Sequence, residues 1–173
     1  MQIRAIVRPR GIWIYRGLRW TLGIIFLYSG MTKLLVPEQF AVLIEAYGLV
    51  PDPLLMPVAL LLPALEVLAG AGLMVDLRGS LGVIAGLLLL FVAILGYGIF
   101  LGLDVDCGCF GPEDPEAEAF HGLRPAIVRD LIMLAAIGGL YVWRRLGRIR
   151  PKTVKQLIQR IVNRKRRVEN AYG

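Results

Sequence analysis

Residues 80–103 read Ser80-Leu-Gly-Val-Ile-Ala-Gly-Leu-Leu-Leu-Leu-Phe-Val-Ala-Ile-Leu-Gly-Tyr-Gly-Ile-Phe-Leu-Gly-Leu103 and carry no charged side chain. A bilayer core is crossed by about 20 consecutive apolar residues in a helix, so this stretch is long enough to span it. The protein as a whole is 57% hydrophobic, with a mean hydropathy of +0.65. The sequence therefore predicts an all-α integral membrane protein.

Three further stretches are predicted to cross the membrane, at about residues 12–36, 54–75 and 125–143. Pro37 is expected to end the first helix, and Pro57 and Pro63 predict a kink in the second. Residues 38–53 are too polar to span and are predicted to lie on the membrane as a short amphipathic segment. The fold class that follows is a four-transmembrane-helix bundle.

Two glycine-containing stretches add detail to this bundle. Asp76-Leu77-Arg78-Gly79 predicts a tight turn between the second and third spans. Within the third span, Gly82 and Gly86 form a Gly-x-x-x-Gly pattern, which permits two helices to approach closely. We therefore expect this pattern to lie at a packed helix interface.

The charged residues are distributed asymmetrically along the chain. Of 20 lysines and arginines, five lie in residues 1–20 and eleven in 144–173, whereas nine of 13 acidic residues lie in 37–53 and 103–118. Because basic flanks stay in the cytoplasm, both termini are predicted to be cytoplasmic and the acidic loops to face outward. The first span lacks a clear signal-peptide cleavage site and is expected to remain as a helix. We expect a multi-pass protein of a bacterial cytoplasmic membrane.

The basic C-terminal tail is predicted to be a separate unit, residues 147–173, following a membrane domain at residues 1–146. Its apolar side chains recur at the spacing of an amphipathic helix: Val154, Leu157, Ile158, Ile161 and Val162. Lysines and arginines surround this stripe, which favours binding to an anionic lipid surface. The charge pattern does not favour nucleic acid as a partner.

Cys107 and Cys109 are the only cysteines in the sequence, and they lie in the long polar loop after the third span. Three interpretations remain open at this point: a redox-active dithiol on the oxidising side of the membrane, a metal site, or two structural cysteines. A disulfide across one intervening residue closes a small, strained ring, which favours disulfide exchange over structural stabilisation. For the metal alternative, Asp106 and His121 are nearby ligand candidates.

The charges around the cysteines bear on their reactivity. Acidic neighbours such as Asp104 and Asp106 disfavour a thiolate, so a reactive cysteine needs an offsetting positive charge. The start of the fourth span is predicted to supply that charge through its helix dipole and Arg129.

Glu66 is the other candidate functional residue, because an ionisable group within a span is costly to bury. If the second span begins near Leu54, Glu66 lies about 18 Å into the membrane, whereas Lys33 lies only about 5 Å below Pro37. A direct Lys33–Glu66 pair is therefore not expected, and Lys33 is interpreted as an interfacial anchor. Glu66 is expected either to relay protons or to be protonated and bonded to a backbone carbonyl or Tyr28.

Four stretches carry a resemblance to a known family of membrane proteins. They are Asp106-Cys-Gly-Cys-Phe-Gly111, Arg124-Pro-Ala-Ile-Val-Arg129-Asp130, Gly23-Ile-Ile-Phe-Leu-Tyr-Ser-Gly30-Met-Thr-Lys33 and Leu65-Glu66-Val-Leu-Ala-Gly70. Over residues 12–145 the chain resembles the MauE (methylamine utilisation E) family, and its first span is similar to that of the related DoxX proteins.

This resemblance implies a four-helix bundle that takes part in thiol-disulfide chemistry outside the cytoplasm, with a thioredoxin-like protein or a maturing client as partner. Cys107 and Cys109 are then the redox pair, with Arg129 and Glu66 in supporting roles. The protein would be a thiol-disulfide oxidoreductase, and a lipid quinone is a candidate cofactor. Two alternatives stay open beside it: a non-catalytic membrane scaffold or assembly factor, and a metal-handling protein using the cysteine loop.

Overall fold

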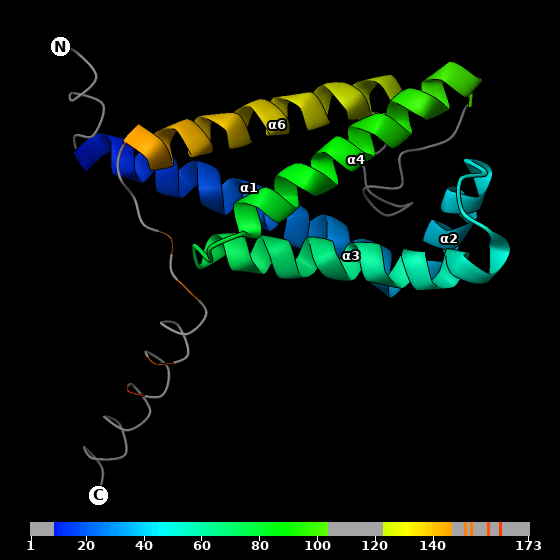
Figure 1. The fold of residues 1–173 in the computed structure, drawn as a ribbon, viewed down its shortest axis with the longest axis horizontal. Coiled ribbons are helices and arrows are strands. Elements are labelled where there is room, and N and C mark those ends of the chain that lie inside the picture. Colours follow the sequence, from blue (N-terminus) through cyan, green and yellow to red (C-terminus); the bar gives the residue numbers. More distant parts are fainter. Residues whose placement is uncertain are drawn as a thin grey trace, which may run out of the picture.

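The computed structural model of the protein describes residues 9–103 and 123–146, together with four isolated residues of the tail (Figure 1). Over these ranges the chain is helical and contains no β-strand. The elements in chain order are α1 (Pro9–Leu35), α2 (Pro37–Ala46), α3 (Asp52–Met74), α4 (Ser80–Leu101) and α6 (Leu123–Leu146). Cys107, Cys109, His121 and the amphipathic stripe of the tail lie outside the described residues.

The described helices are long and apolar enough for a membrane protein. α3, α4 and α6 each satisfy the length and hydropathy of a span, and α1 does so together with α2, which is bent from it by 96°. Large apolar side chains also face outward, among them Trp13, Leu68 and Phe100. Such a surface suits a lipid environment. The predicted all-helical membrane bundle is thus confirmed, with three to four spans.

Glycines bring α1 and α3 into close contact. A Cβ atom added at Gly30 would lie 2.7 Å from the carbonyl oxygen of Pro63, and one added at Gly70 would lie 2.8 Å from that of Gly23. These distances are shorter than real Cβ contacts, so the two backbones touch where only glycine fits. The crossing of α1 and α3 is therefore set by glycines on both helices.

The Gly82-x-x-x-Gly86 pattern does not form such a crossing. A Cβ atom added at Gly86 would meet nothing within 4 Å, and one at Gly82 would meet only the Tyr141 hydroxyl at 3.3 Å. The prediction of a packed interface at this pattern is wrong. Small residues permit close approach, but which face of α4 packs is decided by its large buried side chains, including Ile84 and Leu88.

The bundle core lies between α1, α3, α4 and α6. Its fully buried members include Leu73 of α3, Ile84 and Leu88 of α4 and Ile137 of α6. A smaller cluster, which joins Tyr47 to Leu95, Leu123 and Ala126, lies at the end of the bundle near α2. The bundle therefore has a packed middle and a separate apolar contact at the α2 end.

A polar cluster fastens the opposite end of the bundle. Asp76, in the turn between α3 and α4, accepts a hydrogen bond from Tyr15 and pairs with Arg19 at 2.9 Å and with Arg144 at 2.6 Å. The predicted turn at Asp76–Gly79 is confirmed, with positive φ at Asp76 (62°) and Gly79 (100°). Because Tyr15 and Arg19 lie on α1 and Arg144 on α6, the cluster joins three segments that are distant in the sequence.

At the α2 end the helices separate. α3 and α4 diverge from their connecting turn, and α2 lies near the wide end of the opening (Figure 1). α1 stops at Leu35, and Pro37 begins α2 at a position where its missing N–H costs nothing. The predicted helix stop at Pro37 is therefore confirmed, and the amphipathic segment folds as a short helix with Phe40 buried.

Candidate functional site

An ion pair lies within the bundle between α1 and α3. Lys33 Nζ donates a hydrogen bond of 2.8 Å to Glu66 Oε1, and the side chains are only 4% and 1% exposed. The ammonium also lies over two aromatic rings, at 4.8 Å from the centroid of Phe91 and 5.2 Å from that of Phe40. One carboxylate and the faces of two aromatic rings therefore stabilise the buried ammonium of Lys33.

This pair corrects two sequence-based interpretations: Lys33 is not a surface anchor, and Glu66 is bonded to it directly. The expectation that Lys33 and Glu66 are too far apart to pair was wrong, because it assumed that the α1–α2 junction and the start of α3 lie at the same depth in the membrane. Gly30 contacts Pro63 and lies level with Glu66. From the level of Glu66, α3 extends about 21 Å toward the α2 end, whereas α1 extends only about 8 Å beyond Gly30, at 1.5 Å per residue. Lys33 is therefore deeper than assumed.

Asp130 of α6 is a second buried carboxylate. It is 1% exposed, and its Oδ1 accepts hydrogen bonds from Arg129 Nε at 3.0 Å and Nη2 at 2.9 Å. Lys33 is close enough to Asp130 for their charges to interact. Residues of α1, α3 and α6 thus form one group of charges, defined here as the buried charge cluster: Lys33, Glu66, Arg129 and Asp130.

Two oxygens of this cluster are unused among the described residues. Glu66 Oε2 and Asp130 Oδ2 are buried and accept no hydrogen bond there. A carboxylate oxygen without a partner is costly to bury, so such groups need a reason in function or in an additional bound molecule. Two carboxylates beside an ammonium can also accept and release protons within the apolar part of the bundle.

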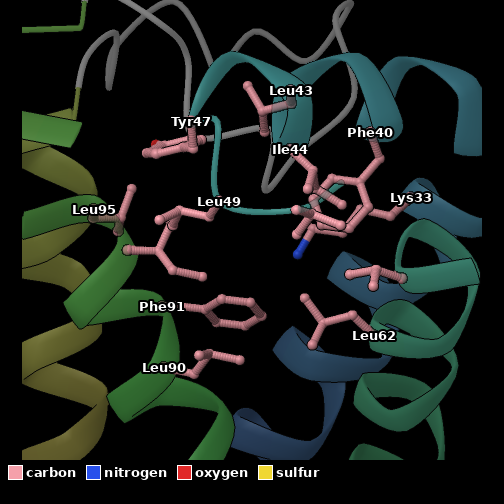
Figure 2. Close-up of a pocket in the computed structure, with 13 residues that line it drawn as sticks. Lys33, Phe40, Leu43, Ile44, Tyr47, Leu49, Leu62, Leu90, Phe91 and Leu95 are labelled. Atoms are coloured by element: carbon pink, nitrogen blue, oxygen red, sulfur yellow. The ribbon is translucent and has the colours of Figure 1, made fainter. Parts of the chain in front are cut away.

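An apolar cavity of about 320 Å³ opens beside the Lys33 ammonium. α2 covers it, and its walls come from α3, α4 and the connection after α2 (Figure 2). Figure 2 shows the amino end of Lys33 pointing inward between Phe40 and Phe91. Among the described side chains that line it, Lys33 is the one charged residue, and the others are Phe40, Leu43, Ile44, Tyr47, Leu49, Val50, Val58, Leu62, Leu90, Phe91, Ile94 and Leu95.

The described ends of the chain on either side of the cysteines lie in an apolar cluster beside this cavity. Leu103, after α4, and Leu123, at the start of α6, belong to the apolar cluster that contains Tyr47 and Leu43 of α2. A Cβ atom at Gly98 would lie 2.7 Å from the Tyr47 ring and 3.0 Å from Leu123. The described residues that precede and follow the cysteine segment therefore belong to the same apolar cluster as Tyr47, which lines the cavity.

Of the four residues expected at the site, the structure brings two into one group. Glu66 and Arg129 both belong to the buried charge cluster, whereas Cys107 and Cys109 lie outside the described residues, as do the metal-ligand candidates Asp106 and His121. Sequence reasoning singled out Glu66 as the ionisable residue within a span and missed Asp130. The signal was present: Asp130 lies two turns into an apolar helix.

The chain is similar in sequence to known proteins. Residues 12–144 match the profile of a family described as methylamine utilisation protein MauE. A curated relative, the methylamine utilization protein MauE of Paracoccus denitrificans, is 32% identical over 108 residues. The alignment covers 61% of this chain and 56% of that relative, so the chain spans about half of the relative's length. No solved structure matches the chain.

Proposed function

Because the chain belongs to the MauE family of methylamine utilisation proteins, we propose that it is a membrane thiol-disulfide redox protein. Cys107 and Cys109 exchange disulfides with a thioredoxin-like partner or a maturing client protein outside the cytoplasm. The fold proposed for this task is a four-span bundle, residues 1–146, with a basic amphipathic tail, residues 147–173.

The observation that carries this proposal is the position of the two chain ends that hold the cysteine segment. Leu103 and Leu123 belong to the apolar cluster around Tyr47, at the end of the bundle opposite Asp76, Arg19 and Arg144. Cys107 follows Leu103 by four residues, which span at most about 14 Å. We therefore expect both cysteines at the same end of the bundle as the cavity and the buried charge cluster.

The charge distribution supports an outward orientation for that end. Arg19, of the basic segment 1–20, and Arg144, of the basic segment 144–173, pair with Asp76 at the opposite end, and Arg145 lies beside Arg144 in the last turn of α6. Basic flanks are retained in the cytoplasm, so the α2 end is the extracytoplasmic one. Thiols on that side are exposed to an oxidising compartment, which suits disulfide exchange.

The proposed exchange conserves atoms and electrons. A thiolate of the client attacks one sulfur of the Cys107–Cys109 disulfide, and the other sulfur leaves as a thiolate. The second client thiolate then breaks the mixed disulfide. The client gains a disulfide, and Cys107 and Cys109 together take up two electrons and, on protonation, two protons. The reverse sequence of steps reduces a partner's disulfide.

Two other residues support this chemistry in the proposal. Arg129 lies less than two turns after Leu123, and its positive charge offsets the acidic residues beside the cysteines. It also holds Asp130 by two hydrogen bonds. Glu66 holds Lys33 at the cavity and provides a buried proton acceptor. At the other end, the basic tail binds anionic lipid on the cytoplasmic surface.

Trapping of a mixed disulfide tests the proposed exchange. Cys109→Ser and Cys107→Ser are expressed separately, free thiols are alkylated in intact cells, and adducts are separated without reductant. At least one single variant is expected to give an adduct that dithiothreitol releases, and the double variant none. Absence of an adduct from both single variants would refute the exchange. A redox potential for the pair below about −300 mV would instead indicate a structural bridge.

A further inference from the structure

The apolar cavity has the dimensions and lining of a small-molecule site. Its volume of about 320 Å³ falls at the small end of ligand pockets, which run from about 300 to 1,000 Å³. Leu49 and Leu90, which line it, are 51% and 43% exposed, so the cavity opens at the molecular surface. In a membrane-spanning bundle such an opening admits lipid-soluble molecules.

The Lys33 ammonium provides the specific polar contact. An ammonium has three N–H donors, and Lys33 uses one of them on Glu66 within the described part of the chain. The remaining donors are on the side of the Phe40 and Phe91 rings, where Figure 2 shows the nitrogen pointing inward. A ligand oxygen placed there would accept a charge-assisted hydrogen bond in dry surroundings.

The charges around Lys33 determine whether the ligand is anionic, cationic or neutral. Glu66 already neutralises Lys33 by direct contact. An anionic ligand would bring a second negative charge to an ammonium that Glu66 already neutralises. A cationic ligand would be repelled by the ammonium, and no carboxylate is among the described lining side chains. A neutral molecule with an acceptor oxygen encounters neither penalty.

The aromatic side chains indicate the shape of the ligand. Phe40, Tyr47 and Phe91 all line the cavity, and flat rings pack favourably against aromatic side chains. We propose that the cavity between α2, α3 and α4 binds the ring of a neutral, lipid-soluble carbonyl compound of the membrane quinone class, with a ring carbonyl oxygen accepting a hydrogen bond from Lys33. This inference uses α1 to α4 alone, so it stands or falls separately from disulfide exchange by the cysteines.

Binding of decylubiquinone to the purified full-length protein in detergent tests the proposal, with calorimetric titration as the readout. Decylbenzene, which lacks carbonyl groups, and decanoate, which is anionic, are compared under the same conditions. Saturable binding of decylubiquinone is expected, with the two comparison compounds at least about tenfold weaker, since a hydrogen bond to a charged donor is lost or repulsion is added. Equal or tighter binding of decylbenzene or decanoate, or no saturable binding of decylubiquinone, would overturn the proposal.

Two variants locate the site. Leu90→Trp fills the cavity mouth and is expected to weaken decylubiquinone binding about tenfold or more, whereas Leu89→Trp, on the neighbouring exposed position, keeps wild-type affinity. The double variant Lys33→Met/Glu66→Leu removes the ammonium without leaving a lone buried charge. It is expected to lower the preference for decylubiquinone over decylbenzene about tenfold. An unchanged preference, or equal affinity in the two tryptophan variants, would contradict the assignment.

Discussion

Lys33, in the last turn of α1, and Glu66, in the middle of α3, form a hydrogen-bonded ion pair of 2.8 Å that is almost fully buried. A cation in the last turn of a helix also interacts favourably with the helix dipole. The pair fixes the end of α1 against α3 one turn beyond the Gly30 contact. It therefore joins the glycine-packed part of the bundle to the cavity under α2.

Removal of one partner of this pair is expected to destabilise the protein more than removal of both. Lys33→Met leaves Glu66 as an unpaired buried charge, which costs about 3–5 kcal/mol. Lys33→Met/Glu66→Leu replaces the pair by apolar side chains and is expected to remain near wild-type stability. The temperature at which the detergent-solubilised protein loses its monodisperse size-exclusion peak measures this difference.

Glu45→Gln provides the control for this comparison, because Glu45 is exposed on α2 and its charge is solvated. It is expected to leave the unfolding temperature unchanged. If Lys33→Met is as stable as Glu45→Gln, the buried ion pair makes no contribution and the assignment of Lys33 to the cavity floor fails.

The glycine contact between α1 and α3 gives a second prediction. Gly30→Ala places a methyl group against the carbonyl oxygen of Pro63 and is expected to cost about 1–3 kcal/mol, because the helices must separate. Gly86→Ala meets open space and should be neutral or stabilise by up to about 1 kcal/mol, the difference in helix propensity. The same thermal assay separates the two variants. Equal loss in both would show that the two helices do not touch at Gly30.

Much of the fold was predictable, because long apolar stretches form the spanning helices, and proline and glycine residues mark where helices end. Residues 80–103 predicted the span that is observed as α4. Pro37 predicted the end of α1, and Asp76–Gly79 predicted the turn between α3 and α4. Helix faces were less predictable. Gly82 and Gly86 show the usual small-residue spacing, yet the close approach is made by Gly23, Gly30 and Gly70, because contact depends on which helices meet and at what level.

The site was only partly predictable for a similar reason. Glu66 stands out as an ionisable residue within an apolar span, but its partner depends on the register between α1 and α3. That register follows from the 96° bend after Leu35, which leaves α1 shorter than α3 at the α2 end. The sequence of one helix predicts how far a residue lies from the end of that helix. It does not predict how far one helix is shifted along its axis relative to another.

Because Asp76 pairs with Arg19 and Arg144, we predict that this turn residue stabilises the bundle. Asp76→Asn keeps a side chain that tolerates positive φ but removes the charge that pairs with Arg19 and Arg144. We expect a loss of about 1–3 kcal/mol, the range for hydrogen bonds to charged groups. Asp52→Asn, at the exposed start of α3, is the control and should cost less than about 1 kcal/mol. Equal stability of the two variants would show that the cluster does not fasten this end.

The proposed orientation predicts which residues a membrane-impermeant maleimide reaches in intact cells. In a Cys107→Ser/Cys109→Ser background, Glu45→Cys places a thiol on the exposed side of α2, and Arg78→Cys places one in the turn at the opposite end. Since basic flanks hold the Asp76 end in the cytoplasm, Glu45→Cys should react before permeabilisation and Arg78→Cys only after it. The lysines and arginines that remain in 1–20 and 144–173 preserve the topological bias of the Arg78→Cys variant. The reverse pattern of labelling would place the cavity and the ends of the cysteine segment on the cytoplasmic side, where glutathione keeps thiols reduced, and would refute the proposed exchange with an extracytoplasmic partner.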